Sequence, residues 1–373
     1  MNGNRTYSMK KIGILTFWNV PNYGTFLQAY ALQKAIAYLD VNFDVKQIAY
    51  LEPTHYRQYY AINNAKFHYG IIDPRTYVNI AKRLFSKKIK ELKPFLTYYK
   101  DFIPCTKPLT KRSLPTEYFD SVVLGSDIIW DYSIRFFNND EFLFGNNLNC
   151  KNILSYAASF GTVKPKQSCP EYVRTGLNNL SAISVRDENS KNLVNQYVGK
   201  NSIIVCDPTI LWDFRNDENI PQVKESKYII VYGSDFRQEL IKGCIDYAKK
   251  NNLQIICLDS LDDTFDWCDK NIKQNELNPF QWLAYFKHAE RIFTCTYHGL
   301  MFSLIFNKKT VFSPTQFIMD KASSLIDYLD LRPVLVNFNT FEEKADWEWD
   351  YDKINAKFDT LKQSSLQFLR DNL

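Results

Sequence analysis

Short apolar runs alternate with longer amphipathic segments along most of this chain. The apolar runs are predicted strands, and the first series lies at 11–17, 45–51, 120–124, 152–158, 180–185 and 202–206. A second series follows at 228–232, 253–258, 291–294 and 309–312. Helical periodicity predicts helices at 25–38, after 188, up to about 250, at 279–288, at 300–306 and at 353–370. Buried strands separated by helices are typical of mostly parallel sheets covered on both faces, so the predicted fold class is α/β.

The two series of strands predict two Rossmann-like domains. A linker at 213–227, rich in Asp and Asn and containing Pro221, joins them and suits an exposed connection. We expect an N-terminal domain over 1–220 and a C-terminal domain over 221–345. The helix predicted within 346–373 is expected to pack back across both domains.

A long aromatic segment interrupts the first series at 52–115. Its pattern is irregular apart from a predicted helix near 77–92. Aromatic residues make up 16% of the chain, and aromatic faces stack well on the C–H faces of pyranose rings. We interpret the segment as an insertion that forms part of an acceptor site or a lid.

Composition and charge exclude some classes of protein. The chain has 373 residues, 45% hydrophobic and 23% charged, which is typical of a soluble globular protein. The net charge of +5 is mild and the Lys and Arg residues are interspersed with Asp and Glu, so no nucleic-acid partner is indicated. The densest basic stretch, 87–90, is better explained as a solvated helix face, with a peripheral membrane contact as the minority interpretation.

The eight cysteines favour a cytoplasmic protein with reduced thiols. None forms a C-x-x-C pair, and Cys206, Cys257 and Cys295 lie inside apolar strands, where cysteine acts as a small hydrophobic residue. Residues 1–10 are polar and lack the apolar core of a secretory signal, and no apolar run is long enough to span a bilayer. No paired spacing of metal ligands occurs, so we expect no metal cofactor.

Polar residues gather where five predicted strands end. The five sets are Asn22/Tyr23/Gly24, Gly125/Ser126/Asp127, Arg186/Asp187/Glu188, Gly233/Ser234/Asp235 and Tyr297/His298/Gly299. In parallel sheets these ends lie at carboxyl edges, where open α/β folds bind ligands. Each set alone could be an ordinary turn or helix cap, and Asp after a strand is commonly an N-cap. Together they favour a binding cleft lined by both domains.

His298 is the most informative single residue. It follows the strand at 291–294 and begins the apolar helix at 300–306, which places it at a sheet edge beside a helix N-terminus. Such an N-terminus attracts anions, so a proton donor beside a phosphate fits this position. The alternative is a histidine that only fills a turn.

Arg186 ends a strand and precedes a helix. A guanidinium there can fork onto a carboxylate or a phosphate. The alternative is an intrachain pair with Asp187 or Glu188. Asn22-Tyr23-Gly24 lacks the full G-x-G-x-x-G pattern, so a dinucleotide cofactor is not indicated.

Six short blocks follow one another along most of 11–315. They read NYGTFLQAYAL at 22–32, LGSDIIW at 124–130, YAASFG at 156–161, SVRDE at 184–188, DPT at 207–209 and TCTYHG at 294–299. In this order they resemble the signatures of polysaccharide pyruvyl transferases. Thr296 stands where the family usually has Ser, Tyr297 where it has Phe, and Ile128 where Gln is common, which bears on acceptor contacts.

The resemblance implies a glycosyltransferase-B-like arrangement of the two domains around a cleft. It implies phosphoenolpyruvate as the donor and a glycan or lipid-linked oligosaccharide as the acceptor, giving a pyruvate ketal and phosphate without a cofactor. His298 is then the general acid and Arg186 the donor clamp. The remaining candidate substrate-binding residues are Asn22, Tyr23, Gly24, Ser126, Asp127, Ser159, Glu188, Thr296 and Gly299.

Two other functions stay open at this point. One is a glycosyltransferase that uses a nucleotide-sugar on the same two-domain frame. The other is a non-catalytic protein of polysaccharide assembly. An enzyme at the inner face of the cell membrane would suit a lipid-linked acceptor. The sequence specifies neither the acceptor sugar nor an oligomeric state.

Overall fold

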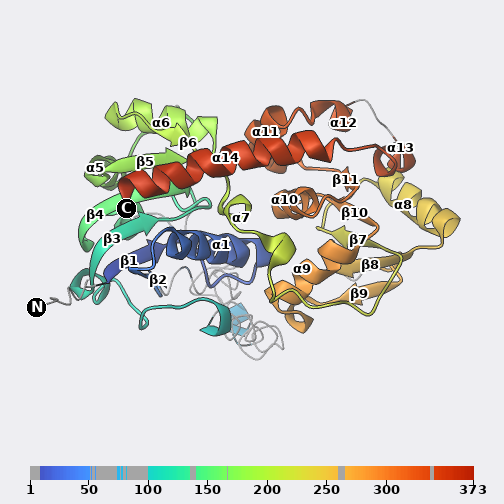
Figure 1. Ribbon diagram of the computed structural model, residues 1–373, viewed down its shortest axis with the longest axis horizontal. Coiled ribbons are helices and arrows are strands. Elements are labelled where there is room, and N and C mark those ends of the chain that lie inside the picture. The colour runs from blue at the N-terminus through green and yellow to red at the C-terminus, as the bar shows by residue number, and fades with distance from the viewer. Residues whose placement is uncertain are drawn as a thin grey trace, which may run out of the picture. The chain divides into compact units, whose positions relative to one another are not determined.

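The computed structural model describes residues 9–50, 52, 55, 74–75, 77–78, 81, 100–134, 140–165, 167–258, 265–336 and 340–373. The chain divides into two compact units (Figure 1). Unit 1 comprises Met1–Trp212 and Leu361–Leu373, and unit 2 comprises Asp213–Thr360. Most of the predicted aromatic segment, including most of the helix predicted near 77–92, lies outside the described residues.

Unit 1 is built on a six-stranded parallel sheet in the order β2-β1-β3-β4-β5-β6. The strands are β1 (Lys10–Leu15), β2 (Phe43–Gln47), β3 (Tyr118–Leu124), β4 (Asn149–Ala158), β5 (Ala182–Val185) and β6 (Ile203–Ile204). Its helices are α1 (Tyr23–Leu39), α5 (Glu171–Asn179), α6 (Glu188–Val198) and α7 (Pro208–Leu211), with 3-10 turns η1 (Leu114–Thr116) and η2 (Glu141–Phe144). The apolar strand runs therefore pair side by side, as parallel strands covered by helices require.

Polar residues at the helix ends of unit 1 explain where its helices begin. Asn22 accepts the N–H of Thr25 to start α1, and Asp187 accepts the N–H of Ser190 to start α6. Gly199 ends α6 in the left-handed conformation, at φ 64°. α1 packs against β2 and α7. Each cap thus fixes a helix that starts at the carboxyl edge of the sheet.

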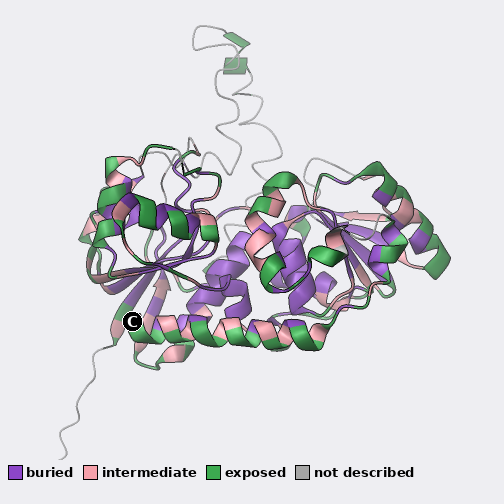
Figure 2. Ribbon diagram, turned by 90° about the horizontal axis from the view of Figure 1, so that it is seen from above, coloured by how far each residue is buried: buried purple, intermediate pink, exposed green. Residues whose placement is uncertain are grey.

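Unit 2 is built on a five-stranded parallel sheet in the order β11-β10-β7-β8-β9. The strands are β7 (Tyr228–Tyr232), β8 (Gln254–Leu258), β9 (Lys270–Ile272), β10 (Arg291–Thr294) and β11 (Thr310–Phe312). Its helices are α8 (Gln238–Asn251), α9 (Pro279–His288), α10 (Tyr297–Ile305), α11 (Gln316–Tyr328), α12 (Arg332–Val336) and α13 (Phe341–Ala345), with 3-10 turns η3 (Phe214–Asn216) and η4 (Gln274–Glu276). Much of each sheet is coloured as buried in Figure 2, and β7 and β11 are buried along their whole length.

The last helix, α14 (Tyr351–Asn372), contributes residues to both units, because the division falls within it between Thr360 and Leu361. In unit 1 its Leu369 is fully buried and the backbone oxygen of Asn372 accepts a hydrogen bond from the Asn152 side chain at 2.9 Å. The final turns of the chain are therefore part of the unit 1 fold.

The predicted α/β class with two parallel sheets is confirmed. The strands predicted at 228–232 and 291–294 and the helix predicted at 279–288 have the observed bounds. β9 and α11 were not predicted, because β9 is a three-residue polar edge strand and α11 begins in a turn rather than after a strong apolar run. None of the described helices is both long and apolar enough to cross a membrane.

Candidate active site

The carboxyl edge of the unit 1 sheet contains a topological switch point. The chain passes from β1 outward to β2 and then returns to β3 on the other side of β1, so the loops after β1 and β3 diverge there. Open α/β sheets bind ligands at such a point. Thr16 follows β1, and its hydroxyl donates to the backbone oxygen of Ser126 after β3 at 2.9 Å. This bond ties the two loops together.

Asp127 lies at this switch point in a left-handed backbone conformation, with φ at 73°. Aspartate tolerates that conformation better than most residues do. Its Oδ1 accepts the N–H of Ile128 at 2.9 Å, and its Oδ2 accepts the hydroxyl of Thr25 at 3.3 Å. The carboxylate is 6% exposed. Its direction is thus set by its own loop and by the first turn of α1.

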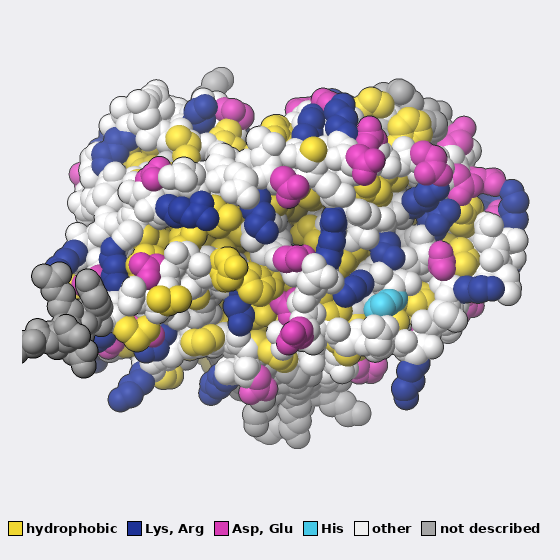
Figure 3. Space-filling model, viewed as in Figure 1, with side chains coloured by type: hydrophobic (Ala, Val, Ile, Leu, Met, Phe, Trp, Pro, Cys, Tyr) yellow, Lys and Arg dark blue, Asp and Glu magenta, His cyan; other side chains and the backbone are white. Residues whose placement is uncertain are grey.

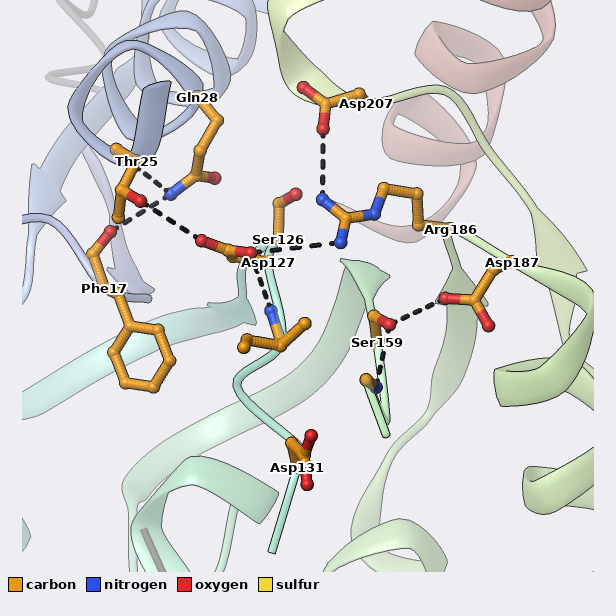
Figure 4. A network of polar contacts seen from close by, with 12 residues as sticks. Phe17, Thr25, Gln28, Ser126, Asp127, Asp131, Ser159, Arg186, Asp187 and Asp207 are labelled. Carbon is orange, nitrogen blue, oxygen red and sulfur yellow. Dashed lines mark hydrogen bonds and ion pairs between the residues drawn. The ribbon is translucent and has the colours of Figure 1, made fainter. Parts of the chain in front are cut away.

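Arg186 directly follows β5 and is buried. Its Nη1 donates to Oδ2 of Asp207 at 3.2 Å, and its Nη2 lies 3.9 Å from Oδ1 of Asp127 (Figure 4). The other oxygen of Asp207 accepts the N–H and the hydroxyl of Thr209, at 3.0 and 2.7 Å. The D-P-T block therefore holds Arg186, a contact that the sequence analysis did not predict.

Two acidic side chains lie beside Arg186. Two carboxylates, those of Asp127 and Asp207, lie within 4 Å of the Arg186 guanidinium. Opposite charges at this range interact strongly when shielded from water. The two carboxylates therefore hold the Arg186 guanidinium from two sides and fix the direction of its side chain.

A bulge in β4 shapes the next part of this edge. The pairing of β4 with β5 shifts register between Ser155 and Ala158, and Ala157 has a φ of 51°. Bulges re-aim the residues that follow them and are common beside active sites. Ser159 follows, and its hydroxyl donates to Oδ2 of Asp187 at 2.6 Å. Ser159 is thereby joined to the first turn of α6.

Other residues of the six blocks build the core. Trp130 is fully buried, donates its indole N–H to the oxygen of Leu143 at 3.0 Å and stacks on Phe144. Tyr156 donates its hydroxyl to the oxygen of Cys206 at 3.0 Å. Burial raises the pKa of Tyr156 well above its ordinary value, so this hydroxyl stays a donor. The blocks therefore combine packing residues with edge residues.

Unit 2 has its own switch point, between β7 and β10. β7 leads through β8 and β9 on one side, and β10 returns on the other. The hydroxyl of Thr294 donates to the oxygen of Tyr232 at 2.7 Å, which fastens the end of β10 to the end of β7. Thr296 is the N-cap of α10, and its hydroxyl accepts the N–H of Gly299 at 2.9 Å. The two threonines of the last block thus fix the turn into α10.

His298 is the second residue of α10 and is 7% exposed. Its ring lies edge-on to that of Tyr297, with the ring centroids 5.3 Å apart. The first turn of a helix carries partial positive charge, so an anion at this position is stabilised. The position at a sheet edge and helix start predicted for His298 is confirmed, and its chemical role stays a prediction.

Lys321 of α11 adds a cation to this edge. Its Nζ lies 5.2 Å from the centroid of the Tyr297 ring, within cation–π range. The turn at Ser313–Thr315 signals a helix start in the sequence. No sequence pattern indicates that Lys321 contacts Tyr297. Its place beside the candidate site could therefore be recognised only from the fold.

The candidate residues fall into two groups, one in each unit. Ser126, Asp127, Ser159 and Arg186 come together in unit 1 (Figure 4), and Thr296, His298 and Gly299 come together in unit 2. Asn22 and Glu188 are exposed at the starts of α1 and α6, and Tyr23 and Gly24 are buried in the first turn of α1. Among the described residues, no cluster of three or more His, Cys, Asp or Glu side chains could hold a metal ion.

Solved structures similar to this chain include sugar-nucleotide enzymes. The UDP-GlcNAc 2-epimerase from Neisseria meningitidis bound to UDP-GlcNAc is 14% identical, with a TM-score of 0.44, covering 96% of this chain and all (100%) of that one. A putative UDP-N-acetylglucosamine 2-epimerase from Listeria monocytogenes is 9% identical, with a TM-score of 0.48, covering 96% and 97%. The E. coli heptosyltransferase WaaC with ADP is 11% identical, with a TM-score of 0.38, covering 83% and 90%. No curated protein matches the sequence at a significant level.

Two parallel sheets, each with a polar switch point, define an α/β protein of the kind that binds ligands at the carboxyl edges of its strands. The family model for polysaccharide pyruvyl transferase matches residues 22–314. The chain belongs to that family.

Proposed function

We propose that the protein transfers the enolpyruvyl group of phosphoenolpyruvate to a pair of sugar hydroxyls on a cell-surface polysaccharide or its lipid-linked precursor. The observation that carries the proposal is the buried His298 at the start of α10, at the switch point of unit 2. That the two carboxyl edges share one cleft stays a prediction from the sequence.

In the proposed reaction the donor anion lies at the unit 2 edge. The start of α10 and the ammonium group of Lys321 supply positive charge there for the phosphate and carboxylate. Protonated His298 delivers a proton to the methylene carbon of phosphoenolpyruvate while a sugar oxygen bonds to the neighbouring carbon. The second sugar oxygen then displaces phosphate. The acceptor hydroxyls lose two protons. One of them replaces the proton that His298 gave to the new methyl group, and the other leaves on phosphate.

The acceptor lies at the unit 1 edge in this proposal. Carboxylates such as that of Asp127, 3.9 Å from Arg186, can accept hydrogen bonds from the hydroxyl groups of a sugar. The role of Arg186 as a clamp for the donor stays a prediction. The competing explanation is that Arg186 only positions Asp127, because two carboxylates already lie beside its guanidinium.

The test measures phosphate release from phosphoenolpyruvate with acceptor glycans that lack pyruvate. His298→Ala should lower turnover by about 10²–10⁴-fold while the fold survives. Arg186→Lys should also lower it, because lysine cannot make a two-pronged contact. His288→Ala, at the end of α9, is the matched control and should leave turnover unchanged. Near-normal release by His298→Ala would remove this residue from the mechanism.

A thermal-shift titration separates the donor classes. Phosphoenolpyruvate should raise the melting temperature by mass action, whereas UDP- and GDP-sugars should not. Stabilisation by a nucleotide-sugar, with none from phosphoenolpyruvate, would instead favour a glycosyltransferase.

A further inference from the structure

Gln28 lies in the second turn of α1 and is fully buried. Its amide nitrogen donates to the backbone oxygens of Thr25 at 2.9 Å and of Phe17 at 3.1 Å (Figure 4). The same nitrogen makes a longer bond, of 3.4 Å, to the hydroxyl of Thr16. Thr16 and Phe17 form the loop after β1, so one buried side chain joins the first turn of α1 to one arm of the unit 1 switch point.

The orientation of the Gln28 amide follows from these partners. The backbone oxygens of Phe17 and Thr25 can only accept hydrogen bonds, so the NH2 group of the amide must face them. An amide turned the other way would bring three oxygen atoms together without a hydrogen between them. A side chain of the same length that lacks the NH2 group therefore cannot make these bonds.

The contact with Thr25 leads to Asp127. Gln28 holds the backbone oxygen of Thr25, and the hydroxyl of Thr25 donates to Oδ2 of Asp127 at 3.3 Å. Asp127 has a left-handed backbone conformation, with φ at 73°. A residue other than glycine keeps that conformation only where its surroundings hold it. Gln28 therefore fixes the backbone from which one bond to the Asp127 carboxylate starts.

The contact with Thr16 leads to the same turn. The hydroxyl of Thr16 accepts from Gln28 and donates its own hydrogen to the backbone oxygen of Ser126 at 2.9 Å. A hydroxyl that accepts one bond and donates another has a fixed rotation, and the two bonds strengthen each other. Ser126 directly precedes Asp127, so both paths from Gln28 end at the turn formed by these two residues, the 126–127 turn.

Gln33 provides a matched comparison on the same helix. It is also buried, and its amide nitrogen also donates to two backbone oxygens, those of Val45 at 3.0 Å and Pro104 at 2.8 Å. Val45 belongs to β2, and Pro104 lies beside the bridge that pairs the end of β2 with Cys105. The two glutamines are thus alike in burial and in their backbone acceptors, but the printed contacts of Gln33 do not lead to the 126–127 turn.

We propose that Gln28 is a positioning residue that holds the 126–127 turn so that the Asp127 carboxylate meets the hydroxyl groups of a hexopyranose acceptor. The proposal rests on the proposed function, which places the acceptor at the unit 1 edge. Gln28 is fully buried, so it acts through Thr16 and Thr25 rather than on the sugar itself. Its loss should weaken acceptor binding and leave donor binding unchanged.

The experiment uses the full chain and measures acceptor binding separately from turnover. The probes are p-nitrophenyl glucopyranoside, galactopyranoside and mannopyranoside, titrated by saturation-transfer NMR without phosphoenolpyruvate. Phosphate release with phosphoenolpyruvate then gives KM for each substrate. Gln28→Met keeps the length of the side chain but removes its donors. It should weaken glycoside binding and raise the glycoside KM by about tenfold, with KM for phosphoenolpyruvate changed by less than about twofold.

Gln33→Met is the matched control. It also removes an amide that donates to two backbone oxygens, so it should lower the melting temperature about as much as Gln28→Met does. Both KM values should nevertheless stay at the wild-type level. A role of Gln28 in stability alone predicts the same KM values for the two variants.

A pair of variants tests the path through Thr25. Thr25→Val removes the hydroxyl that bonds to Asp127 and keeps the backbone N–H that Asn22 caps. If Gln28 acts through this hydroxyl, Gln28→Met combined with Thr25→Val should weaken glycoside binding by less than the product of the two single effects. Full multiplication of the single effects would contradict this path.

The outcomes distinguish the inference from the proposed function. If the wild type binds glycosides and releases phosphate, and Gln28→Met keeps glycoside affinity within about threefold, the inference is overturned and the proposed function stands. Equal weakening by Gln33→Met would also overturn it. If glycosides bind and Gln28→Met weakens them as expected, but the wild type releases no phosphate, the proposed transfer fails and the positioning role stands. If no glycoside binds the wild type, the acceptor site at this edge is wrong and the inference fails with it.

Discussion

Replacing Gly299 by alanine tests whether the turn into α10 is as tightly built as the threonine contacts indicate. A Cβ at this position would lie 2.1 Å from Oγ1 of Thr294 and 2.6 Å from Oγ1 of Thr296. Both hydroxyls already make hydrogen bonds, to the oxygen of Tyr232 and to the N–H of Gly299 itself. Neither can move by the roughly 1 Å that ordinary van der Waals contact requires without losing its bond.

The expected cost follows from these contacts. Loss of the cap costs about 0.5–2 kcal/mol and forced repacking about 1–3 kcal/mol, and the better helix propensity of alanine returns about 1 kcal/mol. The free energy of unfolding should therefore fall by about 0.5–4 kcal/mol, with a central value of about 2 kcal/mol that corresponds to a fall in melting temperature of about 4–8 °C for a unit of this size. The rate of phosphate release should also fall, because the same turn carries His298.

Denaturant and thermal unfolding measure this loss, with Gly199→Ala as the control. Gly199 has a φ of 64° but nothing within 4 Å of the added Cβ, so alanine there costs only the conformational penalty of about 1–2 kcal/mol. Adding Thr294→Ala to Gly299→Ala removes the nearest clash, so the double variant should lose less than the sum of the single losses. Strict additivity, or a loss no larger than that of Gly199→Ala without reduced activity, would refute the tight-turn argument.

Three further variants have definite expected outcomes. Asp207→Asn keeps the shape but weakens the bond that orients Arg186, so phosphate release should fall about tenfold or more, whereas Asp246→Asn on the exposed side of α8 should leave the rate unchanged. Trp130→Ala should lower the free energy of unfolding by about 3–5 kcal/mol in denaturant titrations, because it empties a fully buried site. Burial, followed by Lys287 and Lys308, lowers the pKa of His288, so the unfolded chain takes up its proton first and the free energy of unfolding should fall as pH drops below about 6.5. His288→Gln should flatten that fall in unfolding curves recorded across this pH range.

The charge pattern of the surface agrees with the mild net charge. On the face shown in Figure 3, Lys and Arg side chains are interspersed with Asp and Glu side chains. Ion pairs such as that between Lys250 and Glu342 join them locally. This face therefore offers no large basic field of the kind that binds nucleic acids.

The strands and the polar residues at their carboxyl ends could be anticipated from the sequence because buried parallel strands are continuous apolar runs, whereas the strand order could not. The runs before Asp127, Arg186 and His298 each predicted a strand whose end carries a functional candidate, and each residue lies at such an end. This kind of inference depends only on local pattern and on the rules of α/β topology.

Partners that are distant in sequence could not be anticipated. Asp207 and Arg186 are separated by 21 residues, and Asp140 and Tyr50 by 90, without any periodic pattern that connects them. His55 stands in a segment of irregular pattern, so its contact with Asp140 emerges only when the sheet edge is assembled. Local propensity carries no information about such pairs, because tertiary packing alone brings them together.

The hydrogen bond between the Cys206 backbone N–H and the Ser365 hydroxyl, at 3.0 Å, has a consequence for the order of folding during synthesis. Its partners lie 159 residues apart, and the N–H belongs to the residue just before Asp207. When unit 2 has left the ribosome, Ser365 has not yet done so, and the turn that holds Arg186 is therefore completed only after all of unit 2 has been made. Chains fold from the N-terminus as they emerge, yet the unit that emerges first is here the one finished last. A nascent chain stalled before residue 361 should therefore hold Arg186 loosely, although every strand of both sheets has already been made.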